Sequence, residues 1–77
     1  MEINILAFGQ ISEIVGKQSW KLSDVNTTDE LRKKLTELFP ALIEFRYSIA
    51  VNKNIVQNNT ELKQDDTVAL LPPFSGG

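Results

Sequence analysis

The amino-acid sequence predicts an α+β fold, a roll in which a mixed sheet packs on one main helix. Apolar and polar residues alternate near both ends of the chain, at residues 2–8 and 67–71, which is typical of strands with one buried face. A stretch with helical leucine spacing lies between them. The chain has 77 residues, enough for one small domain in which one helix can cover one face of a sheet.

The first expected strand spans residues 2–8 and has one face suited to a core. That face carries Ile3, Ile5 and Ala7. A short helical turn is expected within residues 9–16, because apolar residues recur there at i, i+3 and i+4. Alternation resumes at residues 18–23, where Trp20 is expected to be half-buried in a second strand.

The main helix has a clear start and a clear stop. Thr27 and Glu30 have the spacing of a capping box, in which each side chain satisfies a free backbone N–H of the first turn. The expected apolar stripe consists of Leu31, Leu35, Leu38 and Phe39. Pro40 is expected to end the helix, because the residue before a proline avoids the α region.

Three further strands are expected in the second half of the chain, at residues 47–51, 55–56 and 67–71. The first two are joined by a tight turn at residues 52–54, where asparagine tolerates the left-handed region. Leu62 is expected to anchor the long polar loop that follows to the core. These strands complete a mixed sheet that is wrapped on the helix.

Several apolar residues fall on the face of the sheet that the helix does not cover. With this register, Phe8, Ile55 and Leu71 point outward and form one exposed patch, while Leu70 points inward. Contiguous exposed apolar surface usually marks an interaction site. A shift of one residue in register would instead turn each of these side chains into the core.

Composition argues against several kinds of chemistry. The chain contains no histidine and no cysteine, so imidazole catalysis, a thiolate nucleophile and a thiolate metal site are excluded. A net charge of -2 does not suit nucleic acid or an acidic membrane surface. The sequence shows no targeting peptide and no apolar run of membrane-spanning length. A cytoplasmic domain that is no enzyme on its own, with neither bound metal nor cofactor, is therefore expected.

The predicted domain organisation is a folded domain of residues 1–71 followed by an extended tail of residues 72–77. Pro72 and Pro73 fix φ and hold the start of the tail extended. An extended tail loses less conformational entropy when it inserts into a partner. The tail is therefore expected to be a segment that other proteins bind.

The last residues of the tail suggest the chemistry. Gly76 and Gly77 have no Cβ, so their backbone can thread a narrow channel, and Phe74 and Ser75 are expected to be a spacer that touches its walls. A free carboxylate is inert toward nucleophiles, but adenylation with ATP activates it. Attack by a sulfur donor would leave a thiocarboxylate, whereas attack by an amine would leave an amide. The residues alone leave both reactions open.

The chain resembles the small subunits of molybdopterin synthase, the MoaD-type sulfur carriers, which have a ubiquitin-like β-grasp fold. The resemblance extends over essentially the whole chain and includes "INILAFGQISEIVG" and "TTDELRKKL". Its most specific part is "ALLPPFSGG", where a strand runs through two prolines into a diglycine. Phe74 departs from the family, whose tails often carry a smaller residue there, and this bears on the fit of the tail in its channel.

The resemblance implies a cycle of activation and sulfur transfer. Gly77 would be adenylated by an E1-like enzyme that consumes ATP, and a sulfur-transfer protein would help convert it to a thiocarboxylate. The tail would then enter the large synthase subunit and donate sulfur to cyclic pyranopterin monophosphate, forming the dithiolene. The catalytic side chains would belong to the large subunit, in a heterotetramer. Phe8, Ile55 and Leu71 would dock on that subunit.

Three other interpretations remain. The chain could carry sulfur for thiamine or for tRNA thiolation, although the Pro-Pro exit favours molybdopterin. It could be a ubiquitin-like modifier joined to protein lysines, or a plain interaction domain with an inert tail.

Overall fold

Five strands form one mixed sheet in the computed structural model, which describes residues 1–72. Their order across the sheet is β2-β1-β5-β3-β4. β1 and β5 are parallel, and the other neighbours are antiparallel. The strands are β1 (Glu2–Ala7), β2 (Ser19–Ser23), β3 (Ser48–Val51), β4 (Asn54–Val56) and β5 (Thr67–Leu71).

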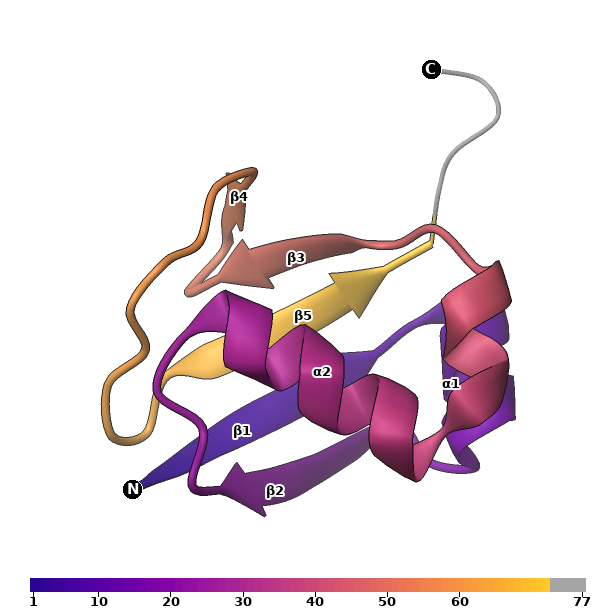
Figure 1. The fold of residues 1–77 in the computed structure, drawn as a ribbon, viewed down its shortest axis with the longest axis horizontal. Helices are drawn as coiled ribbons and strands as arrows, with labels where there is room; N and C mark the ends of the chain where they lie inside the picture. Colours follow the sequence, from indigo (N-terminus) through magenta and orange to yellow (C-terminus); the bar gives the residue numbers. More distant parts are fainter. Residues whose placement is uncertain (73–77) are drawn as a thin grey trace.

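Three helical segments complete the described part of the chain. They are α1 (Gly9–Val15), α2 (Thr28–Leu38) and the 3₁₀ helix η1 (Pro40–Glu44). α2 crosses one face of the sheet, and α1 and η1 lie together at one end of it (Figure 1). Within residues 1–72, no helix has the length and apolar character needed to span a bilayer. The arrangement is the predicted α+β roll.

The predictions for Pro73, Phe74, Ser75, Gly76 and Gly77 lie outside the described residues. The proposed division into a domain and a tail therefore stays a prediction.

The core lies between α2 and the face of the sheet toward it. Alternation in β1 and β5 places every second side chain there, and α2 adds two leucines. The residues that are at most 1% exposed include Ile3, Ile5, Leu31, Leu35, Ile49, Val68 and Leu70. Burial of each such side chain stabilises the fold by about 1.5–3 kcal/mol. The predicted inward faces of the strands and the burial of Leu62 are confirmed.

The predicted start of α2 is confirmed. The Thr27 hydroxyl oxygen accepts a hydrogen bond from the backbone N–H of Glu30, at 3.2 Å. The Glu30 carboxylate reaches back to the backbone N–H of Asn26, at 2.9 Å, one residue before the cap. Two free donors at the start of the helix are thus satisfied, and the negative charge suits the helix dipole.

The expected apolar stripe of α2 is wrong at its end. Leu38 is 51% exposed, because the helix ends there and the chain turns away at Phe39. The Phe39 ring instead packs edge-on against Trp20, with ring centroids 6.2 Å apart. Leu42 of η1 is buried against the same core. The sequence did not predict η1. Pro40 follows the end of α2, and a proline also suits the first position of a new helical segment.

Strand bounds differ from the prediction by one residue at several ends. β1 ends at Ala7, β2 begins at Ser19 and β3 begins at Ser48. Tyr47 was expected in β3, but it lies before the strand with its ring 5.1 Å from the Arg32 guanidinium carbon. Partial burial raises the pKa of the Tyr47 phenol, and the nearby Arg32 charge opposes that shift.

A polar clasp joins the turn between β3 and β4 to the residues that lead into β5. The Asn52 amide nitrogen donates to the Asp66 carboxylate at 3.0 Å, and the Asn52 amide oxygen accepts from the backbone N–H of Thr67 at 3.0 Å. The same carboxylate accepts from the backbone N–H of Lys63 at 2.8 Å. The hydrogen bond from Asn52 first, and that from Lys63 second, hold the pKa of Asp66 below its ordinary value of 3.8.

Asp66→Asn is expected to lower the free energy of unfolding by about 1 kcal/mol at neutral pH, because the amide cannot accept both hydrogen bonds. A lowered carboxyl pKa stabilises the fold fully above the unfolded-state value, near 3.8. This contribution is lost as the pH falls through the lower folded-state pKa. Denaturant titrations of both proteins across this range should therefore converge in acid. Equal stability of the two proteins at neutral pH would contradict the role of the clasp.

Candidate functional site

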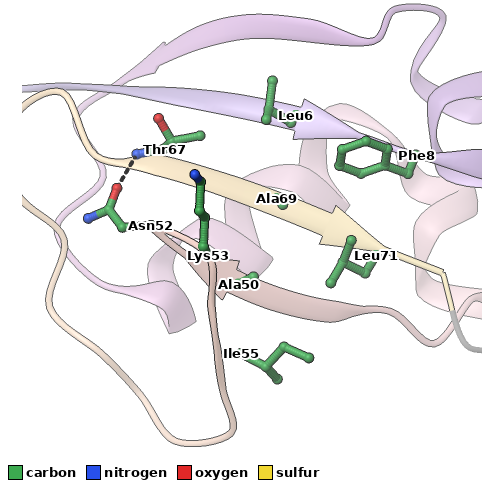
Figure 2. Close-up of a pocket in the computed structure, with 9 residues that line it drawn as sticks. All are labelled: Leu6, Phe8, Ala50, Asn52, Lys53, Ile55, Thr67, Ala69 and Leu71. Carbon is green, nitrogen blue, oxygen red and sulfur yellow. Dashed lines mark hydrogen bonds between the residues drawn. The ribbon is translucent and has the colours of Figure 1, made fainter.

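An open apolar groove of about 520 Å³ lies on the face of the sheet opposite α2 (Figure 2). Its lining comes from β1, β5, β3 and β4, from the turn between the last two, and from Phe8, which follows β1. The residues that line it are Leu6, Phe8, Ala50, Asn52, Lys53, Ile55, Thr67, Ala69 and Leu71.

The sheet register explains why this face is hollow. Ala50 of β3 and Ala69 of β5 lie directly opposite each other, so two short side chains form the floor. Larger side chains stand around them. Phe8 and Leu71 lie near the end where β5 leaves the sheet, and Ile55 lies on the side of β4 (Figure 2). A hollow floored by alanines and walled by larger apolar groups can accept an apolar side chain from a partner.

The structure brings together the three residues that were expected to form a patch. Phe8 is 45% exposed, Ile55 is 62% exposed and Leu71 is half-buried, and all three line the groove. The outward register of these side chains is confirmed. Their part in binding stays a prediction, as does that of Pro72.

Pro72 is the last described residue, and it is held close to the start of α1. Gly9 has φ of +57°, and a Cβ placed on it would lie 3.1 Å from the Pro72 Cγ. The backbone N–H of Phe8 also donates to the carbonyl oxygen of Leu70, at 3.3 Å. The chain therefore leaves β5 beside the end of β1, next to the walls of the groove.

Sequence reasoning missed the rest of the lining as site residues. Alternation puts Leu6 and Ala69 on the outward face, but a small residue such as Ala69 gives no signal of a groove floor. Alternation also puts Ala50 on the face opposite Ile49 and Val51, but its pairing with Ala69 is a long-range contact that the sequence did not reveal. Asn52 and Lys53 occupy a turn that the sequence predicted, without any indication that the turn lies at the edge of a groove.

The groove suits binding better than catalysis. Among the described residues that line it, Lys53 alone is ionisable. Within residues 1–72, no three carboxylates are grouped closely enough to hold a metal ion, and the chain has no histidine or cysteine. The described lining is mostly apolar, with Lys53 as its one ionisable side chain, and such a surface is typical of a site that docks a partner.

Comparison with known proteins agrees with the family resemblance seen in the sequence. The sequence matches the ThiS family over residues 5–77. It is 34% identical to the molybdopterin synthase sulfur carrier subunit of Chlamydomonas reinhardtii, with 100% of both chains covered.

Solved structures of related proteins have a similar fold. The fold is similar to a chain of the complex of subunits 1 and 2 of molybdopterin-converting factor from Helicobacter pylori, at 32% identity, TM-score 0.76 and 100% coverage of both chains. It is also similar to small archaeal modifier protein 1 from Methanosarcina acetivorans, at 26% identity and TM-score 0.82, covering 99% of this chain and 96% of that one. The ubiquitin-like β-grasp fold implied by the resemblance is confirmed.

Proposed function

The chain belongs to the ThiS family, and we propose that it is the sulfur carrier of molybdenum cofactor biosynthesis, the small subunit of molybdopterin synthase. The observation that carries the proposal is the position of the groove. Leu71 lines the groove and is also the last residue of β5, which leads directly into the tail. A partner that covers the groove therefore receives the tail. The full-length similarity to a molybdopterin synthase sulfur carrier subunit supports the large synthase subunit as that partner.

Docking would be driven by burial of the apolar groove. Each Å² of apolar surface removed from water contributes about 25 cal/mol, before the cost of association is subtracted. The exposed parts of Phe8 and Ile55 give up hydration when the large subunit covers them. The outer face of the sheet needs little rearrangement, because hydrogen bonds between β1, β5, β3 and β4 already fix it.

The chemistry would take place at the carboxylate of Gly77. One of its oxygens attacks the α-phosphorus of ATP on an E1-like enzyme, and pyrophosphate leaves. The outer sulfur of a persulfide on a sulfur-transfer protein would then attack the carbonyl carbon and displace AMP, giving an acyl disulfide. A thiol would attack the donor's sulfur, break the S–S bond and form a disulfide with the donor, releasing the thiocarboxylate. Glycine suits this exchange because it has no side chain to hinder attack on the carbonyl.

The charged tail would then deliver its sulfur inside the large subunit, within a heterotetramer. Cyclic pyranopterin monophosphate accepts the sulfur, and water restores the carboxylate of Gly77. Two such transfers supply the two sulfur atoms of the dithiolene. This chain would act as a co-substrate in the cytoplasm, without a bound cofactor, and the large subunit would supply the catalytic side chains. Pro73, Phe74, Ser75 and Gly76 would occupy the channel that leads to them.

A second candidate is a protein modifier. The similarity to small archaeal modifier protein 1 of Methanosarcina acetivorans favours it, because the same activated carboxylate could be captured by a lysine amine. The two candidates differ in product. A carrier yields a free chain with a thiocarboxylate, and a modifier yields an amide bond to another protein.

Intact-mass spectrometry separates these outcomes. The chain, incubated with its activating enzyme, ATP and a sulfur source, is expected to gain one sulfur in place of one oxygen at Gly77. Conjugates that carry residues 64–77 of this chain on a lysine after tryptic digestion, which cleaves last at Lys63, would instead support the modifier. A Gly77 that remains unmodified in the complete mixture, while ATP is consumed, would contradict the carrier.

Leu71→Arg is expected to weaken binding of the large subunit at least about tenfold, because it places a charge in the apolar groove where the interface would bury it. Leu71 is half-buried, so the variant should still fold. The matched control is Leu38→Arg, the same substitution at an exposed leucine of α2. Calorimetric titration of the large subunit measures both. Equal affinities for the two variants would show that the groove is not the docking surface.

A further inference from the structure

The turn between β3 and β4 holds a lysine in an unfavourable backbone conformation. Val51 and Asn54 are paired, so Asn52 and Lys53 form a two-residue hairpin turn. Both have positive φ, 49° at Asn52 and 75° at Lys53. Asparagine suits the first position of such a turn, and glycine usually occupies the second. A lysine there carries a cost in backbone strain, and strained residues cluster at functional sites.

The polar end of the groove is formed by Asn52, Lys53 and Thr67. Of these, Asn52 is already engaged at both ends of its amide, by Asp66 and by the backbone of Thr67. The clasp therefore fixes the turn rather than serving a ligand. Lys53 is therefore the charged side chain at this end of the groove.

The Lys53 side chain extends across β5 at the polar end of the groove. Figure 2 shows it rising from the turn near Thr67 and Ala69, and all three residues line the hollow. A lysine can lay its aliphatic stem on apolar surface while its ammonium group stays in water. Lys53 thus adds a positive charge at one end of a groove whose opposite end is walled by Phe8 and Leu71.

We propose that Lys53 is a specificity-determining residue, which selects a large subunit that places a carboxylate beside the apolar group that fills the groove. This inference rests on the proposed function. The chain as a whole carries a net charge of -2, so it offers no general attraction to an acidic partner. A local positive charge at the rim would instead fix the orientation of docking and reject a partner with a basic group at that position.

The test compares three variants by calorimetric titration with the large subunit. Lys53→Asn removes the charge and keeps a residue that tolerates the left-handed region. Lys53→Glu reverses the charge. Lys21→Glu is the control, because Lys21 pairs with Asn4 on the outward face of the same sheet but does not line the groove.

Lys53→Asn is expected to weaken binding about three- to tenfold, and Lys53→Glu by more than about tenfold. Lys21→Glu should stay within about twofold of the parent chain. The difference between Lys53→Asn and the parent chain should shrink at high ionic strength, because an exposed ion pair is screened by salt. Thermal melting provides a separate readout. Lys53→Asn is expected to melt no lower than the parent, so weaker binding cannot be attributed to unfolding.

The outcomes separate this inference from the proposed function. If Lys53→Glu binds as Lys21→Glu does while Leu71→Arg binds at least about tenfold more weakly than the parent, the groove docks the large subunit and the selective role of Lys53 is overturned. The docking proposal is overturned if the parent chain does not bind the large subunit, or if Leu71→Arg binds as well as the parent. The inference about Lys53 is then overturned as well.

Discussion

The parallel pairing of β1 with β5 at the centre of the sheet determines both the core and the candidate site. In this register Ile5 lies opposite Val68 and Ala7 opposite Leu70, and all four side chains are buried. Alternation then sends Leu6, Ala69 and Leu71 to the opposite face. A slip by one residue would exchange the two sets, destroying the core and the groove together. Stability and the proposed docking therefore depend on one register.

The small size of the fold leaves one face of the sheet available. Within the described residues, α2 covers the inner face, and the outer face over Ala50 and Ala69 stays open as a groove. Exposed apolar groups on that face add little to folding, and a partner that covers them gains hydrophobic free energy. The end of β5 links this surface to the tail. In the proposed function, recognition and chemistry would occupy different parts of one small chain, the groove and the carboxylate of Gly77.

Features set by local sequence were predictable, and features set by long-range contacts were not. Thr27 and Glu30 predict the start of α2. Alternation along residues 2–8 and 67–71 places Phe8 and Leu71 outward. The exposure of Leu38 depends on how the chain turns after α2, which spacing alone cannot give. The clasp between Asn52 and Asp66 joins residues fourteen positions apart, so neither its geometry nor the placement of Lys53 on the groove was visible in the sequence.

The most direct test of the account is an NMR titration of the ¹⁵N-labelled chain with its large subunit. The central claim is that the outer face of the sheet and the tail that follows β5 form one continuous binding surface. Amide signals of Leu6, Phe8, Ala69 and Leu71, and those of the tail, are then expected to shift together, while signals from the exposed side of α2 stay in place. Shifts confined to α2, or to the tail without the sheet, would contradict the account.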